Sequence, residues 1–308
     1  MPRPNRFLLA QTEILAFFSA GPKTIFSEDE LAGVLFTNKH GWRLPDSAGL
    51  SKFIAFLGSH GQLQTHVFRS EAYGRDITRY SWGTPSPYAI AIALKPRGYL
   101  SHGSAAILHG LAAPDPGTLY LNVEQSQKPA PRGGLSQRGI DLAFSRRQRQ
   151  SNLVYTKGTL SVVQLAGKHS ERLGVDNLVG PEGEILAVTD LERTLIDIVV
   201  RPAYAGGPAL VLAAYCDAKN RIDIDRLITT LKTLDYIYPY HQAIGFLMQQ
   251  AGYPEGALAK LRALGIKHKF YIDYGMKDPI FNSEWRLYYP KDIHTLPIPK
   301  RRRRAGSS

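Results

Sequence analysis

Residues 47–61, SAGLSKFIAFLGSHG, decide the fold of the first part of this 308-residue chain. The glycines near the end of this stretch are expected to stop a helix. The sequence therefore predicts a helix that begins near Ser47 and carries Ser47, Ser51 and Lys52 on its polar side. Its apolar residues recur at i, i+3, i+4 and i+7, the spacing that gathers side chains on one helix face: Leu50, Phe53, Ile54 and Leu57.

Two shorter helices are expected before this one. Residues 12–19 place apolar side chains on one side, and Gly21-Pro22 stops that helix. The second helix begins at Ser27, because the Ser27-to-Glu30 spacing predicts a capping box. In that motif the serine hydroxyl accepts a hydrogen bond from the Glu30 amide, and the carboxylate reaches back to the serine amide.

A hairpin is expected after the third helix, because residues 62–69 and 76–82 alternate between apolar and polar side chains. Tyr73-Gly74-Arg75 joins the two strands. Three helices followed by a hairpin is the order of a winged helix-turn-helix, and Pro85 and Pro87 punctuate its end. We therefore predict a DNA-binding domain over residues 1–85.

The third helix of a helix-turn-helix enters the major groove, where its early residues meet base edges while nearby basic side chains hold phosphates. An alternative is that these polar side chains are the solvated surface of an ordinary three-helix unit. The helix is poor in Arg, Asn and Gln, so we expect modest or shape-based specificity. The base-facing candidates are Ser47, Ser51 and Lys52, and the candidates for the DNA backbone or the minor groove are Arg43, Arg69, Arg75 and Arg79.

The net charge of +12, from 38 basic and 26 acidic residues, is unevenly placed. Residues 126–172 carry 9 basic and 2 acidic side chains, a net of +7, and residues 300–304 add +5. Such zones favour a polyanionic partner, although a basic balance also serves solubility alone. Residues 296–308 are expected to be a disordered basic tail. The candidate accessory basic surface is Arg132, Arg138, Arg146, Arg147, Arg149, Arg301, Arg302, Arg303 and Arg304.

Beyond residue 85 the pattern predicts a mixed α/β (α+β) domain over residues 86–295. A helix capped by Thr189 or Asp190 is expected to run to Val200. The other expected helices are 88–95, 104–111, 208–218, 223–234 and 240–251, and the expected strands are 119–123, 152–156, 160–165, 184–188, 268–273 and 284–289.

Catalytic chemistry is weakly represented. His102 and His109 stand seven residues apart, too far along a helix for one metal ion, so a capping or core role is expected. No phosphate-cradling loop and no nucleophilic triad is recognisable. We expect no enzyme, no metal and no cofactor. The one enzymatic alternative is a metal-dependent nuclease built on Glu182, Glu184, Asp190 and Glu192.

A single cysteine, Cys216, excludes an intramolecular disulfide and a thiolate metal cage. The basic N-terminus is followed by a short apolar stretch that Gln11 and Glu13 interrupt, which fits neither a signal peptide nor a membrane span. We expect a cytoplasmic protein without a membrane partner.

Four groups of residues stand in order between about Tyr88 and about Tyr253. They are Tyr99-Leu100-Ser101 leading to Ser104-Ala105-Ala106 and Leu108-His109-Gly110-Leu111; Val188-Thr189-Asp190 with Glu192-Arg193-Thr194-Leu195-Ile196-Asp197; Pro202 with Tyr204-Ala205-Gly206-Gly207; and Gly245-Phe246-Leu247 with Gly252-Tyr253. Together these groups resemble the AbiEi family of type IV antitoxins.

The resemblance implies a bacterial transcriptional autorepressor whose winged helix binds inverted repeats in its own promoter, and whose second domain counters a nucleotidyltransferase-like toxin. Type IV antitoxins are thought to act without a stable toxin complex, so direct contact with the toxin stays open. This chain departs from the family in its long connection before Ser47 and in its basic tail. The alternatives to this function are the nuclease above and a module that binds a toxin directly.

Overall fold

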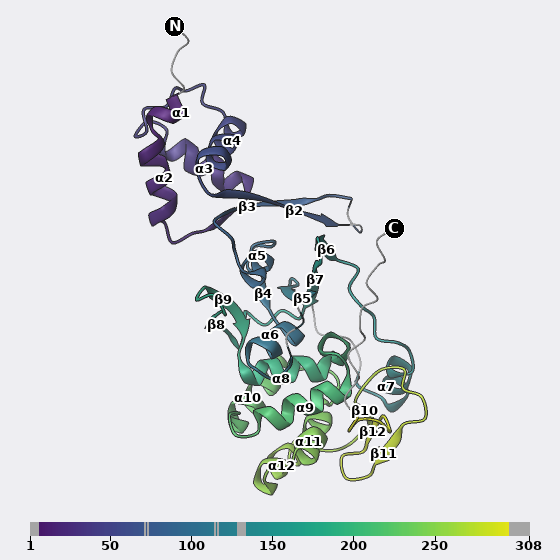
Figure 1. The fold of residues 1–308 in the computed structure, drawn as a ribbon. Coiled ribbons are helices and arrows are strands. Elements are labelled where there is room, and N and C mark those ends of the chain that lie inside the picture. Colours follow the sequence, from purple (N-terminus) through teal and green to yellow (C-terminus); the bar gives the residue numbers. More distant parts are fainter. Residues whose placement is uncertain are drawn as a thin grey trace, which may run out of the picture.

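The chain folds as a mixed α/β protein, as the sequence predicts (Figure 1). The computed structural model describes residues 6–70, 72, 74–113, 115, 117–127 and 134–295. The expected basic tail and Arg132 lie outside the described residues, as do Arg301, Arg302, Arg303 and Arg304. We call residues 6–82 the first unit and residues 87–295 the second unit.

The first unit contains the three helices and the hairpin that the sequence predicts. The Ser27–Glu30 capping box forms in both directions, with distances of 3.2 and 2.8 Å. Two short elements were not expected, the helix α1 and the strand β1, which pairs with β3. The elements are α1 (Arg6–Leu9), α2 (Gln11–Ala20), β1 (Ile25–Phe26), α3 (Glu28–Asn38), α4 (Leu50–His60), β2 (Leu63–Ser70) and β3 (Ile77–Trp82).

Helix α4 begins at Leu50, so the prediction of a start near Ser47 is wrong by three residues. The backbone before it turns, since the Ala48 amide donates to the Pro45 carbonyl at 2.9 Å, and Gly49 is the N-cap. Ser47 consequently lies in the connection and not on the helix.

The long connection between α3 and α4 is held by its own buried side chains. Trp42 and Leu44 are only 7% and 6% exposed and belong to the core of the first unit. The Trp42 ring packs at 5.8 Å from Phe53 of α4 and at 5.7 Å from Phe17 of α2. These contacts fix a connection that is longer than a tight helix-turn-helix turn.

One nine-stranded sheet crosses from the first unit into the second. The far end of β2 pairs with β6, with Arg69 opposite Thr156 and Ser70 opposite Tyr155. The order of strands is β1-β3-β2-β6-β7-β5-β4-β9-β8. The strands of the second unit are β4 (Tyr99–Leu100), β5 (Thr118–Glu124), β6 (Val154–Lys157), β7 (Leu160–Gly167), β8 (Val175–Val179) and β9 (Ile185–Thr189).

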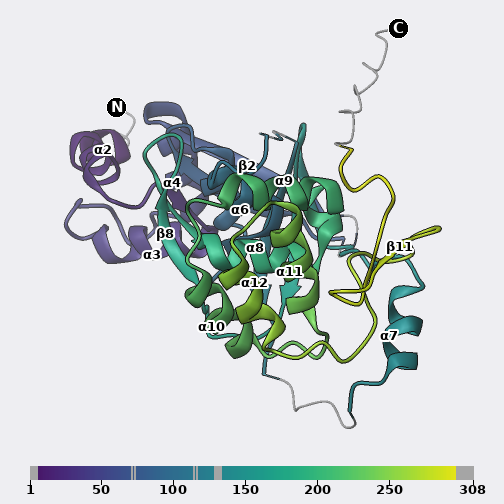
Figure 2. The same ribbon diagram turned by 90° about the horizontal axis from the view of Figure 1, so that it is seen from below.

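The helices of the second unit surround α8, in which eight of ten residues are buried. Figure 1 places this helical body at the far end of the molecule from α1 to α4, and Figure 2 shows it from below. The helices are α5 (Pro87–Ile92), α6 (His102–Leu108), α7 (Gln137–Phe144), α8 (Leu191–Val200), the 3₁₀ helix η1 (Pro202–Ala205), α9 (Pro208–Ala218), α10 (Ile224–Leu234), α11 (Tyr240–Gln250) and α12 (Glu255–Arg262).

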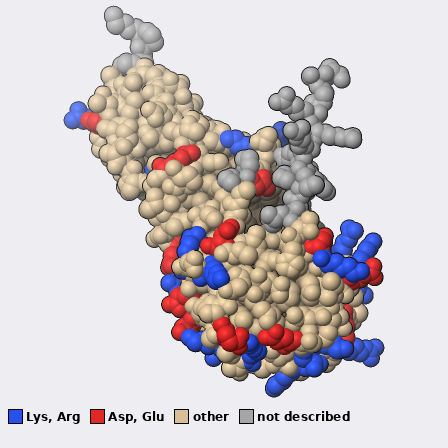
Figure 3. Space-filling view, turned by 60° about the horizontal axis from the view of Figure 1, so that its bottom comes forward, with Lys and Arg blue, Asp and Glu red and all other residues tan. Residues whose placement is uncertain are grey.

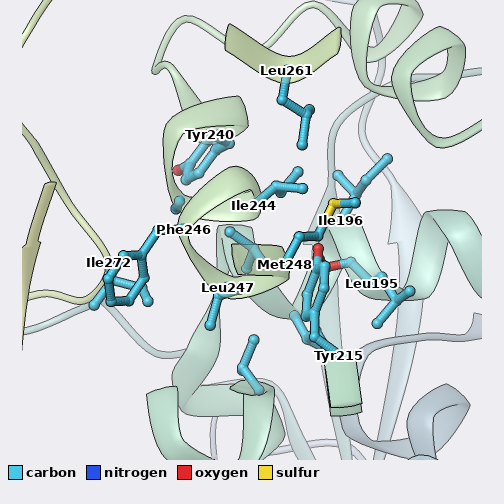
Figure 4. Close-up of a cluster of buried hydrophobic side chains, with 14 of the residues drawn as sticks. Leu195, Ile196, Tyr215, Tyr240, Ile244, Phe246, Leu247, Met248, Leu261 and Ile272 are labelled. Atoms are coloured by element: carbon cyan, nitrogen blue, oxygen red, sulfur yellow. Dashed lines mark hydrogen bonds between the residues drawn. The ribbon is translucent and has the colours of Figure 1, made fainter. Parts of the chain in front are cut away.

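The largest apolar core lies among these helices (Figure 4). Tyr215 is fully buried in it, and its hydroxyl donates to the Leu195 carbonyl at 3.2 Å. Trp285 is also fully buried, and a Cβ at Gly245 would lie only 2.1 Å from its ring. Gly245 therefore lets the indole approach the backbone of α11.

A small second sheet packs beside α7. Its strands are β10 (Phe270–Tyr271), β11 (Ile280–Asn282) and β12 (Leu287–Tyr289), in the order β10-β12-β11. The sequence predicts two of these three strands. None of the helices in the described part of the chain has the length and apolar character to cross a bilayer.

Candidate nucleic-acid interface

Helix α4 is buried on one side and open on the other. Phe53, Phe56 and Leu57 face the core. Ser51, Lys52, Ala55 and Ser59 are exposed and spaced so that they lie along one surface of the helix. No acidic side chain occurs between Leu50 and His60. This surface therefore carries small side chains and one lysine.

A groove runs beside this surface, between α1, the end of the α3–α4 connection and α4. We call it the α4 groove; its volume is about 530 Å³. Its charged side chains, Arg6 and Lys52, are both positive, and His60 lies near its end. The full set of lining residues is Arg6, Phe7, Pro45, Ser47, Ala48, Lys52, Ala55, Phe56, Ser59 and His60. The groove thus offers positive charge to an anion with no carboxylate to oppose it.

The three predicted base-facing residues are all exposed. Ser47 and Lys52 line the α4 groove, and Ser51 lies beside Lys52 on the helix surface. Arg43 is exposed in the connection, in the left-handed conformation with φ of 53°, and is not among the residues that line the groove.

Arg6 and His60 belong to the groove but were not among the predicted site residues. The basic start of the chain was visible in the sequence, but nothing there indicates that α1 folds back beside α4. His60 stacks on Phe56 at 5.1 Å, and its Nδ1 lies 2.7 Å from the Ser59 hydroxyl. That hydroxyl also donates to the Ala55 carbonyl at 2.8 Å, so part of its hydrogen-bonding capacity is used within the helix.

Two of the three hairpin arginines are exposed, and the third is half-buried. Arg69 and Arg75 are exposed. Arg79 instead donates to the carbonyls of Ala93 at 2.6 Å and Leu94 at 2.8 Å, and burial lowers the pKa of its guanidinium. The Arg79 donors therefore hold the start of the second unit, which argues against the predicted role of Arg79 at the DNA backbone or in the minor groove.

A buried histidine ties the hairpin to the second unit. The Ser81 hydroxyl donates to the Gly83 carbonyl at 2.7 Å, so it accepts from His66 Nε2. His66 Nδ1 is then an acceptor for the Lys157 ammonium, 2.5 Å away. Burial and the nearby lysine lower the pKa of His66. Lys157 thus adds a cation beside β2 that the sequence did not single out.

The accessory basic residues of the second unit do not extend the α4 surface. Arg138 lies on α7, and Arg146, Arg147 and Arg149 follow that helix; all four are exposed. Figure 1 places α7 at the opposite end of the molecule from α4. On the face drawn in Figure 3, basic side chains of the second unit are interspersed with acidic ones. A polyanion would meet these residues as a separate zone.

Three of the four acidic residues considered for a nuclease, Glu184, Asp190 and Glu192, have other partners. Asp190 caps α8 by accepting from the Arg193 amide at 2.7 Å, and it pairs with Arg226 at 2.6 Å. Glu192 accepts from the Asp223 amide at 2.9 Å, and Glu184 accepts from Ser86 and from the Glu182 amide. Within the described ranges, no three His, Cys, Asp or Glu residues are grouped so as to hold a metal ion.

His102 and His109 have the structural roles that the sequence predicts. His102 opens α6, is 7% exposed, and its Nδ1 lies 2.8 Å from the Ser101 hydroxyl. His109 is the C-cap residue of the same helix, and its Nε2 lies 2.7 Å from the Thr189 carbonyl.

Comparison with known proteins finds likeness in the fold alone. Neither a family model nor a curated protein matches the chain. The chain is similar to the crystal structure of the RV2827C protein from Mycobacterium tuberculosis, with a TM-score of 0.56 and 15% identity over 91% of each chain.

Proposed function

We propose that the protein is a DNA-binding transcriptional autorepressor and the antitoxin of a type IV toxin-antitoxin pair, with no enzymatic activity of its own. Its first unit acts as a winged helix-turn-helix. Helix α4 enters the major groove of promoter DNA, and an inverted repeat takes two copies of the chain.

The exposed surface of α4, beside a groove with two positive and no negative side chains, carries this proposal. The order of elements supports it, because β1 pairs with β3 and the β2–β3 hairpin follows α4 directly. Arg69 and Arg75 on the hairpin are available for phosphates. The small side chains on α4 favour recognition through DNA shape over bidentate base contacts.

The antitoxin part of the proposal rests on the resemblance to the AbiEi family. The residues that carry this resemblance lie mostly in the core of the second unit. Glu192 to Asp197 are all buried in α8, and Gly245 to Leu247 are buried in α11. These residues support a core shared with the AbiEi family. Because they are buried, they do not indicate which surface would counter the toxin.

Fluorescence anisotropy with DNA from upstream of the gene tests the repressor function. We expect the full chain to bind at low salt and to lose affinity steeply as salt increases. Arg6→Ala and Lys52→Ala should each weaken binding and lower the salt slope by about 1, if each side chain contacts one phosphate. Lys23→Ala is the matched control, since this exposed lysine pairs with Glu30 outside the α4 groove.

Equal losses in Lys23→Ala and Lys52→Ala would contradict the assigned surface. Growth of cells that express a neighbouring nucleotidyltransferase-like gene, with and without this protein, tests the antitoxin function. Co-purification of the two proteins would favour the direct toxin-binding alternative. Cleavage of DNA or RNA in the presence of Mg²⁺ would favour the nuclease.

A further inference from the structure

Two polar pockets that share lining residues lie in the second unit, away from α4, and we call them the inner and outer chambers of one cavity. The inner chamber, of about 100 Å³, lies among α6, β5, β7 and α8. The outer chamber, of about 470 Å³, is more open and shares Ala166 and Arg201 with the inner one. The shared residues make the two chambers neighbours.

Two acceptors on the wall of the inner chamber have no hydrogen-bond partner within the described part of the chain. They are Asn122 Oδ1 and Asp197 Oδ2, on side chains only 2% and 3% exposed. Buried polar atoms are rarely left unpaired, because such an atom has lost its bonds to water without replacement. Both atoms require a donor.

The orientation of the Asn122 amide follows from its neighbours. Burial alone would raise the pKa of Glu124, but hydrogen bonds from Ser170 and Arg172 outweigh it and lower that pKa, so the carboxylate is ionised at neutral pH. The Tyr99 hydroxyl therefore donates to Glu124, at 3.2 Å, and accepts from Asn122 Nδ2. Asn122 Oδ1 is left as the free acceptor.

The chain builds this wall with specific residues. A Cβ at position 167 would lie 2.4 to 2.8 Å from the Asn122 amide, so only glycine fits there without displacing Asn122. Asp197 is held by Arg193, whose Nε donates to Oδ1 at 2.8 Å and leaves Oδ2 unused. The free acceptors are thus fixed in place.

The charge around the two chambers is positive. The lining cations are Arg149, Lys168, Arg193 and Arg201, and the lining anion is Asp197, which gives 4 − 1 = +3. Burial lowers the pKa of His102 to about 4, so its ring is neutral at pH 7. No ion pair joins Arg149 or Arg201 to a carboxylate of the described residues. An ammonium group would be opposed by these cations, whereas an anion would be attracted.

We propose that this cavity binds a nucleotide. A neutral N–H group of the base donates to Asn122 and Asp197 in the inner chamber, and the phosphate lies in the outer chamber at Arg149 and Arg201. The nucleobase supplies neutral donors for the two unpaired acceptors of the inner chamber. The phosphate supplies the negative charge that the surrounding cations attract. None of the residues that line this cavity lies on α4, so nucleotide binding here does not depend on DNA binding at α4.

Isothermal titration calorimetry with the full-length chain tests the proposal. The probes are AMP, GMP, CMP, UMP, ribose 5-phosphate, inorganic phosphate and a 5′-phosphorylated trinucleotide. We expect one binding site for at least one nucleotide, with ribose 5-phosphate at least tenfold weaker because it lacks the base. Tighter binding of a mononucleotide would assign a free nucleotide as the ligand, and tighter binding of the trinucleotide would assign the end of a strand.

A pair of matched variants distinguishes nucleotide binding in the cavity from general attraction of anions to the basic surface. Arg201→Ala should weaken nucleotide binding at least tenfold. Arg147→Ala should leave it unchanged, because Arg147 is exposed nearby but lines neither chamber. The proposal is overturned if no probe binds, if phosphate alone binds as tightly as the nucleotides, or if the two variants have the same effect.

Discussion

Replacing His102 by asparagine should remove a specific part of the acid sensitivity of the second unit. His102 is buried at the start of α6 with φ of 51°, a left-handed conformation that asparagine tolerates better than most residues. Burial lowers the pKa of the imidazole to about 4; Asp197 opposes this shift, while Arg201 and Arg193 reinforce it. The folded protein therefore holds His102 neutral.

The expected change in stability follows from the difference between the pKa of His102 in the folded protein and its pKa in the unfolded chain. An unfolded histidine has a pKa of about 6.5, so between about pH 6.5 and 4 the unfolded chain binds a proton that the folded chain does not. The contribution of His102 to stability is complete above pH 6.5 and is lost as the pH falls towards 4. A difference of about 2.5 pKa units corresponds to about 3 kcal/mol.

Hydrogen exchange of the α8 amides, followed by mass spectrometry, measures the free energy of opening locally and avoids assuming that a chain with several cores unfolds in one step. The wild type should lose about 3 kcal/mol more than His102→Asn between pH 7 and pH 4. Other groups titrate in both proteins and cancel in the difference. Parallel pH curves for the two proteins would refute the assignment of a neutral, buried His102.

Three further substitutions test the packing and the junction. Gly245→Ala should destabilise the second unit by about 1–3 kcal/mol, since the added methyl group meets the Trp285 ring, and urea unfolding followed by tryptophan fluorescence should show an earlier transition. Asp197→Ala leaves the Arg193 guanidinium buried without its carboxylate and should cost about 3–5 kcal/mol in the same measurement. Arg79→Ala should increase hydrogen exchange in α5 while leaving DNA affinity unchanged; a loss of affinity equal to that of Lys52→Ala would restore Arg79 to the DNA surface.

Elements with strong local signals were predicted closely. The helix expected at 208–218 is α9 with the same bounds, and the cap that Asp190 was expected to supply begins α8. Local periodicity does not indicate β8, α7 or α12. Strand β8 lies at the edge of the sheet with a polar centre, and its pairing with β9 depends on a contact that local periodicity does not encode.

The candidate DNA surface was predicted less well because its limits are set by tertiary contacts. Apolar spacing identified α4, but the Pro45–Ala48 turn determines that Ser47 precedes the helix. The alternating pattern of the hairpin did not distinguish Arg69 from Arg79 as candidates for contact with DNA. Only the approach of α5 shows that the carbonyls of Ala93 and Leu94 take up the Arg79 donors.

The hairpin contributes to the apolar cores of both units. Leu63 and Tyr80 belong to the core of the first unit, whereas Phe68, fully buried, belongs to the core around the second unit's sheet. The backbone pairing of β2 with β6 and the His66–Lys157 contact hold the far end of the same strand. The far end of the hairpin is therefore anchored to the second unit. If α4 binds a duplex as we propose, this anchoring would set where the second unit lies relative to the DNA, and it would limit how two copies could share one operator.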